Sequence, residues 1–252
     1  MAAFKNSKQK KIVIWSLSLF LALLIPFLAC GIYLADYYPA DTEAVEAFLA
    51  EKDVSVTTLD GGSMVIEPRE EPVAGLIFYP GGKVDHKAYL PLMTAFAEKG
   101  ILCILVKMPF RLAVFDMDAA ERFEDLYPQV DRWFIGGHSL GGAMAASYLE
   151  KHADGYEGLL LLGAYSSNDL SDKDLRVLSI YGSEDRVLDR EKYQSCYKNL
   201  PKDTTERVIE GGCHAYFGNY GRQDGDGEPT VAREVQLLYT ANAFLEFLKD
   251  GQ

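Results

Sequence analysis

The sequence has 252 residues, of which 48% are hydrophobic and 25% charged, and its formal net charge at pH 7 is −12. The length suits one large domain with or without an anchor, and the composition is that of a globular protein, not a disordered one. A chain this acidic is a poor candidate for binding nucleic acid, because phosphates are held by clustered lysine and arginine. Its net charge does not attract anionic lipids either. Any membrane attachment should therefore come from apolar burial.

An apolar run without a charged residue extends from Ile12 to Leu34, and four lysines between Lys5 and Lys11 precede it. At 1.5 Å per residue such a helix crosses a bilayer core of roughly 30 Å. We therefore predict that residues 1–40 form a basic N-terminus and a transmembrane anchor, held in the membrane by residues 12–34. Because acidic residues follow the run, the positive-inside rule places the N-terminus in the cytoplasm and the main domain outside it.

Two alternatives for this segment stay open. Cleavage after the Ala29-Cys30-Gly31 stretch would release a secreted domain, although the run is longer than the apolar core of roughly 7–15 residues of a signal peptide. The stretch from Phe27 to Cys30 also resembles a bacterial lipoprotein signal with Cys30 as the lipidated residue, but it departs from that pattern at Phe27 and at Pro26.

Residues 41–252 are predicted to form one domain. It begins with an amphipathic helix over 41–52 and a β-hairpin of 54–58 and 64–66 around Asp60-Gly61-Gly62. Continuous apolar runs, typical of buried parallel strands, then cover 75–79, 101–106, 133–136, 159–162, 175–181 and 206–209. Helical patterns lie between or after them at 89–99, 117–126, 140–152, 190–199 and 231–248. Strands that alternate with helices predict an α/β fold with a doubly wound, mostly parallel sheet.

The strongest motif is Gly137-His138-Ser139-Leu140-Gly141, which directly follows a predicted strand and opens a predicted helix. A sharp strand–turn–helix of this kind lifts a serine above the sheet, with small residues two positions before and after it to avoid clashes. It also points the N–H of Leu140, at the start of the helix, towards a developing oxyanion. Ser139 is therefore our candidate nucleophile, against the alternative of a glycine-rich packing turn.

A nucleophilic serine needs a base, and His214 is the candidate among the four histidines. It follows the last predicted strand, at the carboxyl edge of the sheet where such a base should sit. The acid that orients it should follow the preceding strand, where Asp185 is our choice and Glu184 and Asp189 are alternatives. Asp189 is better explained as the cap of the following helix.

The second oxyanion donor should come from the loop after the first long parallel strand, Pro80-Gly81-Gly82-Lys83. Glycine there lets the backbone approach a substrate closely. We predict the N–H of Gly82 as the donor, with that of Lys83 as the second choice.

These motifs resemble the α/β-hydrolase fold family over about residues 54–250. The resemblance rests on Pro80-Gly81-Gly82, Gly137-His138-Ser139-Leu140-Gly141-Gly142, Gly182-x-x-Asp185-x-Val187 and Gly211-x-x-His214. The stretches at 108–113 and 217–227 look like the small bacterial dienelactone-hydrolase-like group. Dienelactone hydrolases proper use a cysteine nucleophile, whereas this chain has Ser139, so their substrate is not carried over. The resemblance implies the fold and a hydrolytic reaction class, without the substrate.

The connection from Gly163 to Asp174 is too short for a helical cap, so we predict no cap domain and an open site. Phe110, Phe115, Tyr216 and Phe217 should flank the cleft as a shallow substrate site, although packing of their loops explains each of them about as well. We predict a serine carboxylesterase for short or exposed acyl groups, with small molecules or envelope esters as substrates. Acyl transfer, thioester or amide cleavage on an envelope component, and a non-catalytic binding protein on the same fold, stay open.

The sequence implies no metal and no organic cofactor. The four cysteines have no spacing typical of zinc ligands, and a disulfide between Cys196 and Cys213 is a minor alternative to free thiols.

Overall fold

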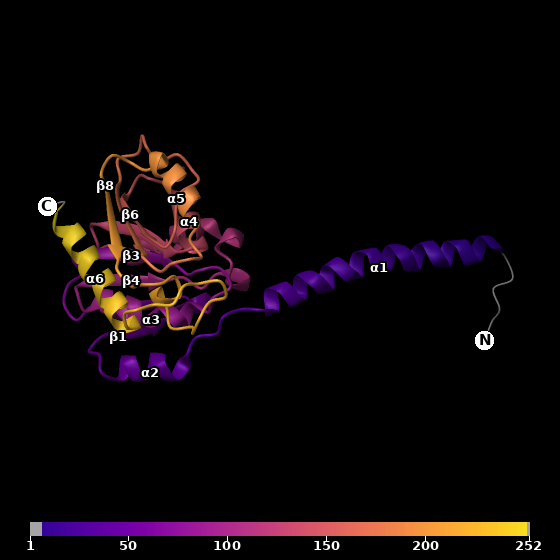
Figure 1. Ribbon diagram of the computed structural model, residues 1–252, viewed down its shortest axis with the longest axis horizontal. Helices are drawn as coiled ribbons and strands as arrows, with labels where there is room; N and C mark the ends of the chain where they lie inside the picture. Colours follow the sequence, from indigo (N-terminus) through magenta and orange to yellow (C-terminus); the bar gives the residue numbers. More distant parts are fainter. Residues whose placement is uncertain (1–6, 251–252) are drawn as a thin grey trace. The chain divides into compact units, whose positions relative to one another are not determined.

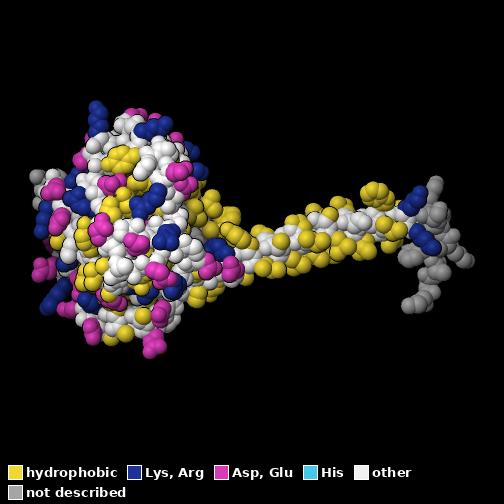
Figure 2. All heavy atoms as spheres, viewed as in Figure 1, with side chains coloured by type: hydrophobic (Ala, Val, Ile, Leu, Met, Phe, Trp, Pro, Cys, Tyr) yellow, Lys and Arg dark blue, Asp and Glu magenta, His cyan; other side chains and the backbone are white. Residues whose placement is uncertain are grey.

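The computed structural model describes residues 7–250 and divides the chain into two compact units, residues 1–37 and 38–252. In the first unit, α1 (Ser7–Ala35) is a continuous helix that includes Pro26 (Figure 1). Apolar side chains cover it along its length (Figure 2). Within the described residues, Lys10–Ala35 is the one helical stretch long and apolar enough to cross a membrane.

The second unit is built on an eight-stranded sheet in the order β1-β2-β4-β3-β5-β6-β7-β8 (Figure 1). The hairpin of β1 and β2 and the pairing of β2 with β4 are antiparallel, and all other neighbours are parallel. The mostly parallel sheet predicted from the sequence is thereby confirmed. The strands are β1 (Ser55–Thr58), β2 (Met64–Glu67), β3 (Ala74–Tyr79), β4 (Ile101–Leu105), β5 (Trp133–His138), β6 (Tyr156–Leu162), β7 (Arg176–Gly182) and β8 (Thr204–Ile209).

Side chains alternate between two buried layers because successive residues of a strand point to opposite faces of the sheet. Leu76 and Phe78 of β3 enter one layer, which also contains residues of α3 (Leu90–Ala97) and α6 (Arg233–Lys249). Ile77 and Tyr79 enter the other layer, with residues of α4 (Leu140–Leu149). Two further helices complete the unit, α2 (Thr42–Ala50) and α5 (Arg190–Cys196). Asp189 caps α5 by accepting a hydrogen bond from the N–H of Lys192, as expected.

The helix predicted over 117–126 is wrong, because the chain forms short 3₁₀ turns at Met117–Arg122 and Glu124–Leu126 instead. The hydroxyl of Tyr79 donates to the carbonyl of Met117 at 2.6 Å and accepts from the N–H of Ala120 at 2.9 Å. A side chain from the sheet therefore takes the backbone groups that an α-helix would pair internally.

Between Gly163 and Asp174 the chain forms only bends and turns, so no helical cap is inserted at this connection. The cysteines are free thiols, and Cys196 and Cys213 form no disulfide.

Candidate active site

Ser139 sits in a strained turn between β5 and α4. Its backbone has φ 53° and ψ −121°, and α4 begins at the next residue. A positive φ is costly for a non-glycine residue and concentrates at functional sites. A Cβ atom on Gly141 would collide with the carbonyl oxygens of Tyr79 and Pro80, so the turn admits only glycine there. The strand–turn–helix predicted from the motif is present.

Asp185 and His214 form a buried pair at the carboxyl ends of β7 and β8. The Asp185 Oδ2 and His214 Nδ1 atoms are 2.8 Å apart, and both side chains are at most 1% exposed. The other carboxylate oxygen accepts the backbone N–H groups of Val187 and Leu188 at 3.0 and 2.8 Å. These bonds fix the carboxylate, which in turn holds the imidazole with Nε2 available for proton transfer.

Ser139 and His214 line one cleft with a volume of about 310 Å³, together with residues of the loops after β6 and β7. The Nε2 atom of His214 is buried and makes no hydrogen bond to any residue that the structure describes. The structure therefore joins the acid to the base, and it brings the base and the serine into one cleft without a bond between them. In enzymes without bound substrate this second bond is often long and tightens only in the complex.

The two residues predicted to supply the oxyanion donors, Leu140 and Gly82, lie in close contact with each other. The side chain of Leu140 lies against Gly82, where its Cδ2 would be 2.9 Å from a Cβ atom built on the glycine. Lys83, the second choice for this role, donates its N–H to the carbonyl of Arg111 at 2.9 Å. Across residues 7–250, the N–H groups of Gly82 and Leu140 have no such backbone partner. The geometry therefore favours Gly82 over Lys83.

The four predicted substrate aromatics lie elsewhere than among the residues that line this cleft. Phe110 and Phe115 are 60% and 58% exposed and pack edge to face, with ring centroids 5.7 Å apart. Phe110 lines a different pocket of about 310 Å³, between the loops after β3 and β4. Tyr216 lies under the Arg233 guanidinium, and Phe217 is buried in the core. Their role in substrate binding stays a prediction.

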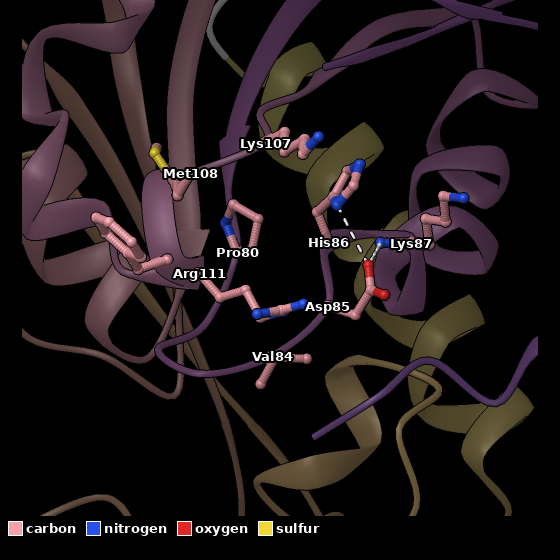
Figure 3. A pocket seen from close by; sticks show the side chains of 9 residues that line it. Pro80, Val84, Asp85, His86, Lys87, Lys107, Met108 and Arg111 are labelled. Atoms are coloured by element: carbon pink, nitrogen blue, oxygen red, sulfur yellow. Dashed lines mark hydrogen bonds and ion pairs between the residues drawn. The ribbon is translucent and has the colours of Figure 1, made fainter. Parts of the chain in front are cut away.

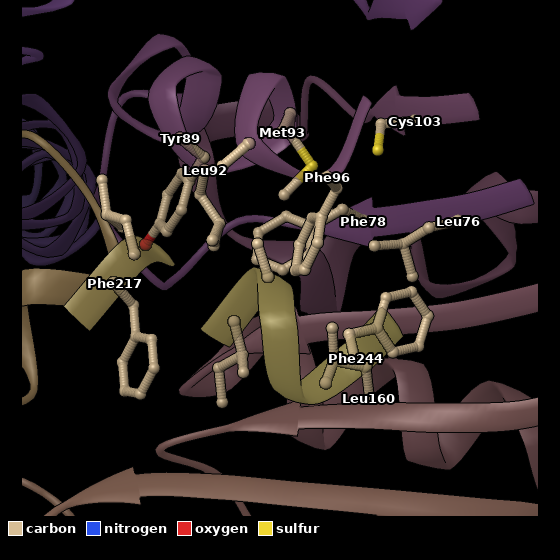
Figure 4. Close-up of a cluster of buried hydrophobic side chains, with 14 of the residues drawn as sticks. Leu76, Phe78, Tyr89, Leu92, Met93, Phe96, Cys103, Leu160, Phe217 and Phe244 are labelled. Carbon is tan, nitrogen blue, oxygen red and sulfur yellow. The ribbon is translucent and has the colours of Figure 1, made fainter. Parts of the chain in front are cut away.

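Tyr89 and His138 form a buried pair next to the site that the sequence did not predict. The Tyr89 hydroxyl accepts the N–H of Gly81 at 3.0 Å and lies 2.8 Å from Nδ1 of His138 (Figure 4 shows Tyr89 in its apolar surroundings). Since that hydroxyl already accepts one bond, its own proton is available for the imidazole. The His138 ring lies 4.4 Å from the ring of His214. Burial, with a smaller effect of positive charge on His214, holds the pKa of His138 well below its usual value, so the ring stays neutral.

Asp226 lies in the stretch 217–227, and the structure gives its side chain a supporting position in the site. Its carboxylate accepts the backbone N–H groups of His214 and Ala215 at 3.2 and 2.8 Å, and those of Arg186 and Gly227 at 3.3 and 2.8 Å. One side chain thus ties the loop that carries the base to the loop that carries the acid. Asp226 is 12 residues beyond His214, a separation at which sequence alone gives no sign of a contact.

Within the described part of the chain, no group of three or more His, Cys, Asp or Glu side chains could hold a metal ion. Burial, followed by the nearby Asp226 carboxylate, raises the pKa of Cys213 to about 12, so this thiol next to the base is not ionised at neutral pH.

The mostly parallel sheet, the strained serine turn at its carboxyl edge and the acid–base pair on the following loops define the α/β-hydrolase architecture. The sequence profile of the alpha/beta hydrolase family matches residues 75–238, and the chain belongs to this family. The narrower resemblance to dienelactone-hydrolase-like proteins stays a prediction. A search of curated proteins found no match.

Solved structures share the fold at low sequence identity. TT1662 from Thermus thermophilus aligns with a TM-score of 0.57 and 17% identity over 79% of this chain and 98% of that one. A predicted CIB-like hydrolase from Thermoplasma acidophilum aligns with a TM-score of 0.53 and 15% identity, over 77% of this chain and 99% of that one. A membrane phospholipase A, described as a bacterial virulence factor, aligns with a TM-score of 0.57 and 16% identity, over 95% of this chain and 99% of that one. The family membership supports a hydrolase, and these structures show the shared fold.

Proposed function

We propose that this protein is a serine hydrolase that cleaves a carboxylic ester through an acyl-enzyme, with Ser139, His214 and Asp185 as its triad. The observation that carries the proposal is the 2.8 Å contact between Asp185 and His214, in a cleft that also contains a serine with a φ of 53°. A strained backbone and a buried carboxylate both cost stability, and their convergence on one cleft is typical of a catalytic site.

The geometry supports the following sequence of steps. The hydroxyl of Ser139 attacks the ester carbonyl carbon while Nε2 of His214 takes its proton, and Asp185 stabilises the imidazolium that forms. The N–H groups of Leu140 and Gly82 donate to the oxyanion, where one such donor is worth on the order of 10²–10³ in kcat. His214 then gives its proton to the departing alcohol. Water, deprotonated by His214, releases the acid and restores Ser139.

The absence of a helix between Gly163 and Asp174 favours substrates with a short acyl group or with an ester that stands exposed on a larger molecule. A long acyl chain would need an enclosed apolar tunnel, which a cap normally completes.

We also propose that α1 holds the enzyme in a membrane, with the N-terminus in the cytoplasm and the domain outside. In support, no charged residue interrupts 12–34, and four lysines precede that run. The similarity to the membrane phospholipase A covers 95% of the chain and therefore extends into α1. Protease added to intact cells should cut the domain, and protection of the domain until the cells are lysed would contradict this orientation.

The ester proposal is tested with full-length protein in detergent and p-nitrophenyl esters of two to twelve acyl carbons. We expect turnover that is fastest for the shortest esters. Mass spectrometry of a reaction quenched after 3 min should find the acyl group on Ser139. Ser139→Ala should lose on the order of 10⁵-fold in kcat. Ser147, on the same helix, donates its hydroxyl to the carbonyl of Ala143 and to the side chain of Asn168, and Ser147→Ala is the matched control that should keep parental rates. Equal activity of Ser139→Ala and the parent would refute the proposal.

A further inference from the structure

The domain is joined to α1 by a very short connection that ends beside the loop of Gly82. Only Asp36 and Tyr37 separate Ala35, the last residue of α1, from Tyr38. Tyr38 is fixed within the domain, since its N–H donates to the carbonyl of Lys83 at 2.8 Å and its carbonyl accepts from the N–H of Asp85 at 2.9 Å. Three residue steps span at most about 10 Å. The chain therefore passes from the last residue of α1 to the residue bonded to this loop in three residue steps.

The same edge of the sheet exposes apolar side chains. In the loop of residues 109–117, which follows β4 and which we call the apolar loop, Phe110, Val114, Phe115 and Met117 are 60%, 49%, 58% and 37% exposed. The apolar loop adjoins the loop of Gly82 directly, because the Lys83 N–H donates to the Arg111 carbonyl at 2.9 Å. Such a concentration of large exposed apolar side chains in nine residues marks an interaction surface.

Cations gather beside the apolar loop in an otherwise acidic protein. The pocket between the loops after β3 and β4 is lined by Lys87, Lys107 and Arg111, and the carboxylate of Asp85 also lines it (Figure 3). That carboxylate accepts the N–H of Lys87 at 3.1 Å and faces His86 at 3.2 Å, and the hydrogen bond with His86 holds the pKa of Asp85 below its usual value. The net charge of −12 does not oppose a local anion here, since charges beyond about 8–10 Å are screened at physiological salt.

We propose that this edge docks on the bilayer that holds α1. The apolar loop enters the interface, and the pocket of Lys87 and Lys107 takes the phosphates of lipid head groups. The inference rests on the proposed ester hydrolysis and gives its substrate class, which is esters presented at the membrane surface. The occupant is a bilayer because apolar and cationic groups lie side by side, as in interfacial segments, and because only Asp36 and Tyr37 separate the proposed anchor from Tyr38, which is bonded to Lys83 and Asp85 at this edge.

The contact is tested by photo-crosslinking of the full-length protein in nanodiscs of phosphatidylcholine with one-fifth phosphatidylglycerol. p-Benzoylphenylalanine replaces Phe115 in one protein and Val73 in a matched control. Val73 is 50% exposed and precedes β3 at the opposite edge of the sheet. We expect lipid adducts by mass spectrometry at position 115 and none at position 73. Adducts at neither position, or equally at both, would overturn the docking surface.

The consequence for catalysis is tested with two esters in the same nanodiscs. Lys87→Glu with Lys107→Glu should slow a bilayer-embedded methylumbelliferyl ester about tenfold, since each cation near an anionic surface contributes about tenfold or less to association. Soluble p-nitrophenyl acetate should be cleaved within about twofold of the parental rate. Lys192→Glu with Lys198→Glu changes the charge equally at the exposed α5 region and should alter neither rate.

Equal slowing of both esters by the Lys87 and Lys107 pair, or no slowing of either, would overturn the inference. A parent that cleaves neither ester would contradict the proposed function itself. The crosslinking result would still decide the docking surface, so the two failures are distinguishable.

Discussion

Gly163 is the point at which one added methyl group should disturb the acid–base pair. Its φ is 52°, and a Cβ atom there would lie 2.9 Å from Nδ1 of His214 and 3.1 Å from Oδ2 of Asp185, the two atoms that share the hydrogen bond. The backbone cannot easily retreat, because the Gly163 N–H is bonded to the carbonyl of Ile180 at 2.8 Å. In Gly163→Ala the imidazole or the carboxylate must therefore move.

The size of the effect follows from these distances. Carbon atoms prefer neighbours at about 3.5 Å or more, so the pair must shift by roughly 0.5 Å. A misplacement of about 1 Å can cost 10²-fold in rate, and we expect kcat/KM to fall roughly 10- to 100-fold. The left-handed backbone costs alanine about 1–2 kcal/mol, partly offset by about 0.4–1 kcal/mol from a stiffer unfolded chain. Stability should thus fall by only about 1 kcal/mol.

The assay measures kcat/KM on p-nitrophenyl acetate and urea unfolding for the same preparations. Gly155→Ala is the matched control, since its φ is 92° and its nearest neighbour, a carboxylate oxygen of Glu124, would be 3.7 Å from the new Cβ. It should lose stability through the same backbone effect and keep its activity. If Gly163→Ala and Gly155→Ala keep equal activity, the Asp185–His214 bond does not position the base as we argue.

Three further outcomes are expected. Asp185→Asn should lower kcat on the order of 10³–10⁴-fold with little change in fold, because an amide no longer holds His214 in the required tautomer; circular dichroism and ester kinetics check this. Asp226→Ala leaves four backbone N–H groups without their acceptor and should reduce the free energy of unfolding by about 2 kcal/mol, measured in urea, together with a loss of at least tenfold in kcat/KM. Burial lowers the pKa of His138 in the folded state. As pH falls below about 6.5, this imidazole is therefore protonated in the unfolded chain before it is protonated in the folded one, and the free energy of unfolding falls by up to about 1.4 kcal/mol per pH unit. His138→Gln should remove that part of the slope between pH 7 and pH 5, and an unchanged slope would contradict it.

The sequence predicted the sheet and the order of Ser139, Asp185 and His214 because each of these features has a local signature. A serine between glycines after an apolar run defines a turn, and residues after parallel strands meet at one edge whatever the rest of the fold does. Local pattern failed at 117–126, where the Tyr79 hydroxyl, 38 residues before Met117, replaces the hydrogen bonds of the expected helix. Tyr89 and Asp226 were missed for the same reason, since their roles arise from contacts between separate loops.

The substrate surroundings were the least predictable part of the site. Aromatic residues near a cleft in sequence can turn outwards, as Phe110 and Phe115 do, or into the core, as Phe217 does. Which of these happens depends on how the loops pack, and some residues that do line the cleft, such as Tyr165 and Ser167, come from a loop with no distinctive motif.

The central claim, an activated serine at position 139, is tested most directly by a fluorescent fluorophosphonate probe on the full-length protein, with peptide mapping by mass spectrometry. The account predicts stoichiometric labelling of the parent at Ser139, none in Ser139→Ala, and persistent labelling in Ser167→Ala, which removes the other serine that lines the cleft. A folded parent that takes up no probe, or that carries it on Ser167, would contradict the account.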